Sequence, residues 1–588
     1  MKIRRTEDEV KKVDPITLAV VRNNLLSIAN GMQETAFRCA VTTYMYEIMD
    51  CCFGLLDENC GVVAQSHGIL LFLGSLGPAT KKAVEMIGKE NLEPGDVIVT
   101  TSPEVTGAHA SDALVFTPIF YKGSIVGYAT TKTHWQDLGA KDTFPTNSTQ
   151  VYGEGLRIPP VRLYKRGVLE KEIWEIIKLN SRAPELVWGD FQAQISGCRS
   201  AEKGVAELLD RYGVDTVKAC IEEMYRYGRT MMEEAIERIP DGVYTAEDCL
   251  DDNGVDAEPI LVKAAITVKG RKVTVDFTGS APEQRGPMNG LLVSTVAASR
   301  AAIKALTVSD IPANEGFYGA VDVIAPPGTV VNAGPSAPTF LYAWVAQIIL
   351  DIVNKALHKV LPEKVPALSG ADVVGQGFVG VDPGTGKYWG TLTPCIIGQG
   401  GDHFEDGANY LYPLAAGACK NTPTEILESS YPLMVESVEL ITDSGGPGKH
   451  RGGLGSKTTF CLSAPATFFS FIEKGKTPHW GLFGGKDGLR NVALVQSKAK
   501  GEFEVLKHPG VELQAGDRVA VTAGGGGGYG DPLDRNPEAV RLDVIRQYVS
   551  RKSAEEDYCV VLGPDLSIEI AATEDLRRNA KTRRRGSI

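Results

Sequence analysis

Two histidines and an aspartate flank a pair of short apolar runs in the first third of the chain. His109 and Asp112 come just before residues 114–120, and His134 comes after residues 124–129. Both runs are rich in β-branched and aromatic residues and are bounded by Gly or Pro, which predicts two strands. The three residues between them predict a tight antiparallel connection. The returning chain would bring the polar residues to one end of the hairpin.

Neutral imidazoles and a carboxylate that meet at one point are suitable ligands for a divalent metal with an open coordination position. Asp50 stands at the start of another apolar run and could either cap that strand or coordinate the same ion. Asp137, three residues beyond His134, could orient the imidazole or act as a base. The plainer interpretation is that these are loop residues capping strand ends, and spacing alone leaves both open.

The elements that must position these residues follow from hydrophobic periodicity. Asp14 as N-cap and Pro15 at the first helical position begin one long amphipathic helix over 15–40. The sequence also predicts strands at 51–56, 62–65 and 97–99, a helix at 74–88 after a Gly74-Ser75 turn, helices at 171–179, 201–239, 293–306 and 343–361, strands at 260–266 and 272–277, and a final helix at 540–549 before a frayed tail of ten residues.

The length of 588 residues is too great for a single core and predicts two to four domains. The 64 glycines exceed ordinary usage and indicate many turns and close backbone approaches. We expect a multi-domain α+β protein, with mixed or antiparallel β-sheets, flanking helices and a glycine-rich C-terminal β region. The expected divisions are an α+β domain with the candidate metal site at 1–240, a central α+β domain at 241–420, a glycine-rich β region at 421–540, and a helix with a tail at 541–588.

Charge and cysteine usage restrict the class of protein. The net charge of −12 argues against a nucleic-acid partner, which would require a basic face. The eleven cysteines show neither zinc-knuckle spacing nor a short secreted framework, which favours free thiols in a reducing compartment. The N-terminus lacks the apolar core of a signal peptide, and no apolar run approaches the roughly 18 residues that span a membrane. A cytoplasmic protein is expected.

Two further features invite a chemical interpretation. Five consecutive glycines at 524–528 could cradle a phosphate through backbone amides, but the Lys-Ser/Thr of a phosphate loop is missing and no helix opens from the run. A tight turn, or a backbone lying against a partner chain, is the better interpretation. His403, within Gly400-Gly401-Asp402-His403, is a second candidate base, with a polar residue in a glycine-rich turn as the alternative.

Several long irregular motifs resemble those of the hydantoinase B/oxoprolinase family. They are DFTGS at 276–280, DIPANEG at 310–316, NTPTE at 421–425, DSGGPGKHRGG at 443–453 and AGGGGGYGDP at 523–532. The family includes ATP-dependent hydantoinases, oxoprolinases, lactamases and the acetone and acetophenone carboxylases. The resemblance implies a B-type subunit that works with an A-type partner, which binds ATP with Mg, and possibly with a further small subunit. It also implies a metal held by Asp50, His109, Asp112 and His134. Mixed imidazole and carboxylate ligation without a thiolate is compatible with Zn or Mn.

Departures from the family pattern bear on the substrate. Phe72 and Trp135 stand where the resemblance leads us to expect histidines. A drier, more aromatic pocket would suit a ketone, so the sequence favours a ketone carboxylase that acts through an enolate stabilised at the metal. Hydrolysis of a cyclic amide such as a hydantoin, 5-oxoproline or a lactam is the alternative. A third possibility is a non-catalytic structural subunit, against which the presence of all four candidate ligands argues.

Overall fold

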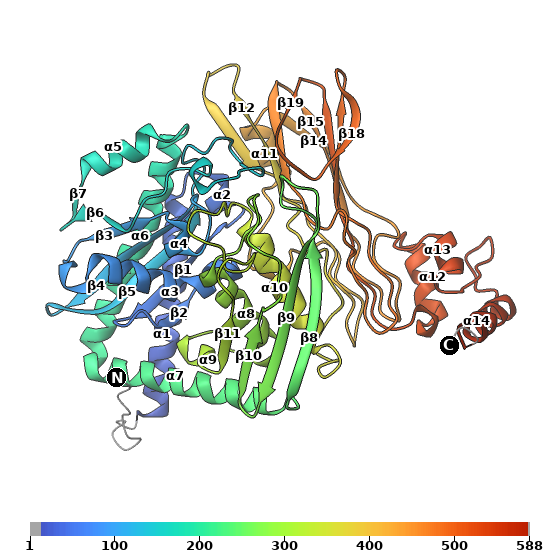
Figure 1. Cartoon of the computed structure of the whole chain (residues 1–588), viewed down its shortest axis with the longest axis horizontal. Coiled ribbons are helices and arrows are strands. Elements are labelled where there is room, and N and C mark those ends of the chain that lie inside the picture. The colour runs from blue at the N-terminus through green and yellow to red at the C-terminus, as the bar shows by residue number, and fades with distance from the viewer. Residues whose placement is uncertain (1–12, 586–588) are drawn as a thin grey trace.

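The computed structural model describes residues 13–585. Its first part is built on a seven-stranded sheet with the order β2-β1-β5-β4-β3-β6-β7, shown in blue and cyan in Figure 1. All neighbouring strands of this sheet are antiparallel. The strands are β1 Cys51–Asp57, β2 Val62–Gln65, β3 Val97–Thr100, β4 Asp112–Tyr121, β5 Ser124–His134, β6 Val161–Lys165 and β7 Val168–Leu169. The predicted strand pairs in this region are confirmed.

Helices cover both faces of this sheet. Helices α1 (Pro15–Cys39), α6 (Pro184–Tyr212) and α7 (Val214–Glu237) share one apolar core with β1 and β5. Helix α1 begins as predicted, because Asp14 accepts a hydrogen bond of 2.8 Å from the backbone N–H of Thr17. The predicted helix over 201–239 is two helices separated at Gly213.

Helix α3 (Leu70–Ile87) packs on the opposite face and begins four residues before the predicted start. The predicted turn at Gly74-Ser75 is therefore wrong, since both residues lie inside the helix. A Cβ at Gly74 would come within 2.8 Å of the Ala297 Cβ on α8 (Leu292–Thr307). This glycine permits close packing of two helices and does not mark a turn.

A second sheet has the order β11-β10-β9-β8 and carries the central part of the chain. Its strands are β8 Gly242–Leu250, β9 Ile260–Lys269, β10 Lys272–Asp276 and β11 Val321–Ile324, with β10 and β11 parallel. Helix α10 (Tyr342–Leu357) packs on β8 and β9 and against α8. The change from helix to strand between α7 and β8 falls where the sequence changes periodicity.

Residues 376–523 form two further sheets that share an apolar core. A four-stranded sheet has the order β13-β12-β16-β19, and a five-stranded sheet has the order β14-β15-β20-β17-β18. The strands are β12 Gln376–Val381, β13 Tyr388–Leu392, β14 Leu433–Leu440, β15 Ser456–Leu462, β16 Ala466–Phe471, β17 Val492–Ser497, β18 Gly501–Val505, β19 Lys507–Leu513 and β20 Arg518–Ala523. The predicted β-dominated region is confirmed.

The five glycines at 524–528 lie inside a bundle of extended segments, visible in Figure 1 between the last sheets and the C-terminal helices. Gly526 donates a backbone hydrogen bond to Gly453, and Gly527 donates one to Leu368, at 3.0 and 2.7 Å. A Cβ at Gly526 would come within 2.0 Å of the Gln399 carbonyl oxygen. The run is thus neither the tight turn nor the partner-chain contact suggested by the sequence. It is a buried ribbon whose neighbours leave no room for side chains.

The C-terminal part contains more helix than predicted. After α12 (Pro537–Ile545) come α13 (Arg551–Glu556) and α14 (Ile570–Arg585), so the predicted frayed tail is helical up to residue 585. The remaining short helices are α2 Thr43–Tyr46, α4 Pro103–Thr106, α5 Lys171–Leu179, α9 Glu315–Tyr318 and α11 Thr424–Ser430. Within residues 13–585, none of the helices combines the length and apolar character needed to cross a bilayer.

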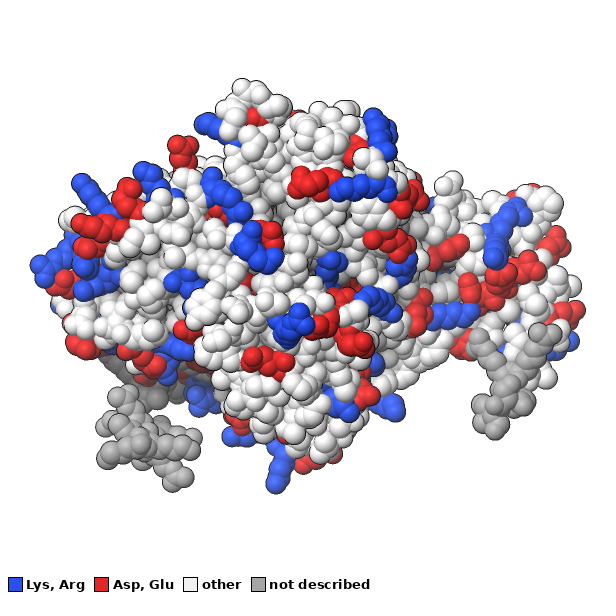
Figure 2. All heavy atoms as spheres, turned by 45° about the horizontal axis from the view of Figure 1, so that its top comes forward, with Lys and Arg blue, Asp and Glu red and all other residues white. Residues whose placement is uncertain are grey.

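The largest apolar core draws residues from all three of the first predicted divisions of the chain. It includes Tyr44 and Phe144 from the first, Phe340 from the second, and Phe469 and Tyr529 from the glycine-rich region. The cysteines form no disulfide in the described part of the chain. On the face shown in Figure 2, basic and acidic side chains are interspersed rather than separated.

Candidate metal site and cavity

The predicted hairpin brings the candidate ligands together. Asp112 is the first residue of β4 and His134 is the last residue of β5, and the two are paired across the strands. His109 lies in the turn before β4, where its carbonyl accepts a hydrogen bond from the Asp112 N–H. Asp50 immediately precedes β1, and its carbonyl accepts from the His134 N–H at 3.1 Å. Strand register therefore places all four residues at one edge of the sheet.

Three of the four side chains converge on one point. Single ligand atoms of His109, Asp112 and His134 all lie within 4.8 Å of one another. The Asp112 carboxylate is 3.5 Å from Nε2 of His109 and 3.2 Å from Nδ1 of His134. The Tyr342 hydroxyl at the start of α10 donates to the same carboxylate at 2.8 Å. Asp50 lines the same cavity but stands outside this closest group.

The protonation states follow from burial and proximity. Burial lowers the pKa of His109 to about 4, which keeps its imidazole neutral. Burial opposes ionisation of Asp112, but the two imidazoles and the Tyr342 hydroxyl hold the pKa of its carboxyl below the usual range. Burial, together with the charge of Asp112, raises the pKa of Asp50 to about 7, although His134 opposes the shift.

The donor set fits a divalent cation. It offers two imidazoles and one or two carboxylates, and within the described residues no lysine or arginine is ion-paired with Asp50 or Asp112. The nearest buried lysine, Lys132, instead donates to Ser75 Oγ and to the Thr106 carbonyl at 2.6 and 2.7 Å. Neighbouring carboxyls without a bound countercharge are costly to bury, and a metal would balance them.

The cluster lies in the wall of an apolar cavity of about 150 Å³. Phe340 stacks on the His109 ring at 4.7 Å between centroids, and Phe144 is parallel to the His134 ring at 6.0 Å. Phe144 in turn stacks on Phe469 of β16 at 4.1 Å. The rings orient both imidazoles and exclude water from one side of the cluster.

Of the two aromatic residues predicted to line the pocket, only Phe72 does so. Trp135 follows His134 in the chain and lies on the other side of the sheet edge, where its indole N–H donates to Gln194 of α6 at 2.8 Å and its ring packs on Phe191. The prediction for Trp135 is wrong because successive strand residues face opposite sides of a sheet. The aromatic wall comes instead from Phe144, a little beyond the hairpin, and from Phe340, which is distant in sequence.

The structure does not bring the two predicted bases to the cavity. Asp137 accepts hydrogen bonds from the backbone and guanidinium of Arg182, which occupy both carboxylate oxygens. It is thus held away from the His134 imidazole that it was expected to orient. His403 lies in its glycine-rich loop beside Phe404 and Tyr529, with no place in the lining of the cavity.

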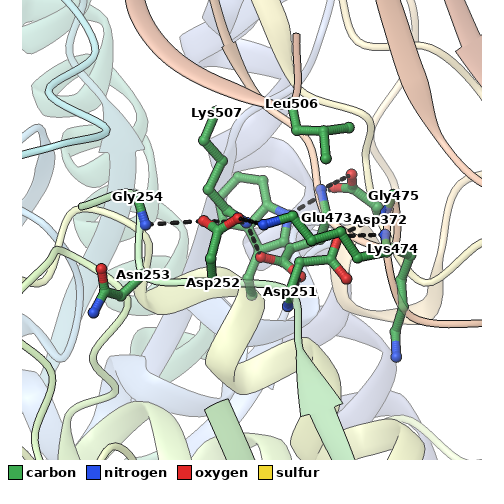
Figure 3. A network of polar contacts seen from close by, with 12 residues as sticks. Asp251, Asp252, Asn253, Gly254, Asp372, Glu473, Lys474, Gly475, Leu506 and Lys507 are labelled. Atoms are coloured by element: carbon green, nitrogen blue, oxygen red, sulfur yellow. Dashed lines mark hydrogen bonds and ion pairs between the residues drawn. The ribbon is translucent and has the colours of Figure 1, made fainter. Parts of the chain in front are cut away.

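A third carboxyl in the cavity wall, Asp372, was not identified from the sequence. It accepts hydrogen bonds from the Trp344 indole N–H and the Glu473 backbone N–H, both at 2.7 Å. Figure 3 shows it at one end of a buried network that continues through Glu473 to Lys507. Asp372 and Tyr342 lie far from the hairpin in sequence, and no spacing or motif marks them.

Comparison with known proteins shows the family of this chain. The sequence model of the hydantoinase B/oxoprolinase family matches residues 14–532. This chain belongs to that family. It is 31% identical to the B-type subunit of a putative D-/L-hydantoinase from Pseudomonas sp. (strain NS671), over 97% of this chain and 99% of the relative. Because family members are ATP-dependent hydrolases or carboxylases, the chain is an enzyme component.

Two solved structures share the fold. The ATP-dependent caprolactamase from Pseudomonas jessenii superposes with a TM-score of 0.91 at 31% identity, over 97% of this chain and 100% of the other. An acetone carboxylase in a nucleotide-free structure superposes with a TM-score of 0.90 over 98% of this chain and 84% of the other. At 20% identity the second likeness shows the fold alone.

Proposed function

We propose that this chain is the catalytic B-type subunit of an ATP-dependent enzyme that opens an apolar cyclic amide, such as a lactam. The observation that carries the proposal is the convergence of His109, Asp112 and His134 on the wall of an aromatic cavity. Such a pocket suits a small, mostly apolar substrate with one polar reacting group. The caprolactamase and hydantoinase likenesses support the same substrate class.

His109, Asp112 and His134 would hold the metal, Zn or Mn, with Asp50 beside them as a fourth ligand. A divalent ion bound there supplies Lewis acidity to the substrate carbonyl. The chain's own residues do the positioning. Tyr342 fixes the Asp112 carboxylate at 2.8 Å, and the stacked rings of Phe340 and Phe144 hold the imidazoles. The surrounding apolar wall keeps the reacting group away from bulk water.

Cyclic-amide hydrolysis fits this cavity better than the ketone carboxylation that the sequence favoured. The ketone prediction depended on Phe72 and Trp135, and Trp135 lies outside the cavity. The cavity also contains Asp372, whose surroundings favour the protonated acid. Breaking a C–N bond requires a proton donor for the nitrogen, whereas enolate formation requires a base.

The nucleotide is expected on a partner. The glycine run at 524–528 is packed inside the chain, where the N–H groups of its last three residues donate to backbone carbonyls and that of Gly524 donates to the Asn491 side chain. We propose that ATP with Mg is held by an A-type partner, which activates the substrate, with a further small subunit possible. The hydantoinase relative is itself named as one subunit of an enzyme, which supports such an assembly.

The complex copurified with this chain should be tested with lactams, hydantoins, 5-oxoproline, and with ketones in labelled bicarbonate. We expect ATP-dependent ring opening of a lactam, no fixation of label, and no activity from this chain alone. Fixation of label into a ketone without ring opening would contradict the proposal, because only a carboxylase retains the bicarbonate carbon.

A further inference from the structure

Asp372 is a carboxyl of the cavity wall that is not among the four candidate metal ligands. The other carboxyls in the lining are Asp50 and Asp112. Asp372 is only 1% exposed and follows α10 in the chain, near Val373 and Gly375 of the same wall. The Trp344 side chain that donates to it also lines the cavity.

The groups that donate hydrogen bonds to the Asp372 carboxyl are uncharged. Its two oxygens accept from Trp344 and from the Glu473 backbone N–H, and within the described residues no lysine or arginine forms an ion pair with it. The nearest ionised groups lie behind it, where Lys507 pairs with the Glu473 carboxylate and with Asp252 (Figure 3). The charged group that acts on Asp372 is therefore another carboxyl, that of Glu473.

Burial raises the pKa of Asp372 to about 8, and the charge of Glu473 acts in the same direction, while N–H donors from Glu473, Trp344 and Val374 oppose the shift. The acid form therefore predominates at neutral pH. A buried, protonated carboxyl in a cavity wall can deliver a proton to a substrate without help from solvent.

We propose that Asp372 protonates the departing nitrogen when the cyclic amide opens. This inference rests on the proposed function. As the C–N bond breaks, its electron pair stays on the nitrogen, which takes the proton from the Asp372 carboxyl. Water adds its hydroxyl to the carbonyl carbon, and its remaining proton restores the acid form of Asp372. The substrate class is thus an amide whose nitrogen is too basic to leave unprotonated.

The test compares two substrates that differ in the leaving nitrogen, an alkyl lactam and an imide of the same ring size. In the copurified complex, Asp372→Asn should slow lactam opening by about 100-fold or more, the usual scale of general acid catalysis. Imide opening should fall by less than about tenfold, because an imide nitrogen leaves without prior protonation. Equal losses on both substrates would mean a structural role and would overturn the proposal.

Asp190→Asn is the matched control. Asp190 is also fully buried, and burial raises its pKa to about 6, but its partners are Val41 and Thr42 on the far side of the first sheet from α10. It should not change the ratio of lactam to imide rates. A second measurement needs no variant, since lactam opening by the native complex should decline above about pH 8 while imide opening should not. Absence of that difference overturns the role of Asp372, whereas absence of any ring opening overturns the proposed function.

Discussion

The His109–Asp112–His134 cluster and the network around Lys507 are both buried and both contain carboxylates, but they differ in how the negative charge is balanced. In the network, Lys507 pairs with Asp252 at 3.2 Å and with Glu473 (Figure 3). Lys476 also pairs with Asp252, at 2.7 Å. In the cluster, the Asp112 carboxylate meets the His109 and His134 imidazoles and the Tyr342 hydroxyl, and within the described residues no lysine or arginine pairs with it.

The two regions therefore differ in their roles, since one stabilises the fold and the other is suited to bind a ligand. A network whose charges are paired within the chain stabilises the junction of β19 with the segment after β8 and has no need of a ligand. A cluster whose charges are unbalanced, and which opens on a cavity, is completed only by something from outside. Asp372 belongs to both regions, because it ends the network and lines the cavity.

The largest expected effect comes from breaking the cluster. His134→Ala should abolish metal binding and lower the activity of the complex on the order of a thousandfold, since several kcal/mol of carbonyl activation would be lost. The fold should survive, because the ring contacts side chains at a cavity edge. Metal content by mass spectrometry, turnover and circular dichroism would be measured on the same sample.

His403→Ala is the control for this experiment, since its ring lies outside the cavity and the variant should keep both metal and activity. If His134→Ala retained full activity after losing its metal, the chain would be better described as a structural subunit.

Removing one partner of the network should act on stability alone. Lys507→Met leaves the Glu473 carboxyl buried without its countercharge and Asp252 with Lys476 alone, and breaking a buried pair in this way typically costs about 3–5 kcal/mol. Adding Glu473→Gln to that variant should restore part of the loss, because it removes one of the stranded charges. The midpoints of chemical denaturation would report this, with metal content unchanged. Loss of metal from Lys507→Met would show that the two regions are coupled.

Local patterns in the sequence predicted the hairpin and hence the ligand cluster, because alternation, Gly and Pro boundaries and short connections act over a few residues. The cavity could not be predicted this way. Phe340 and Phe144 meet the cluster only through the packing of three sheets, and Asp372 carries no local signal. The side-chain direction of Trp135 was also missed, since the preceding residue His134 faces the cavity and Trp135 faces away from it. The run of five glycines was misinterpreted as a turn, because both a turn and a close approach of two backbones favour glycine.

A gradual effect on stability is also expected, as a pH-dependent difference between Asp372→Asn and the native chain. The native carboxyl holds its proton up to a pKa of about 8, whereas an unfolded aspartate loses it near 3.8. Between these values the native state binds more protons than the unfolded state, so the native chain loses stability as pH rises, by at most about 1.4 kcal/mol per pH unit. Asparagine cannot ionise and escapes this loss. Denaturation midpoints should be measured from pH 5 to 9 for both chains. The midpoint of the variant should rise relative to that of the native chain up to about pH 8, and the difference should then stay constant. A constant difference across that range would show that Asp372 is already ionised at neutral pH, and would remove the acid from the cavity wall.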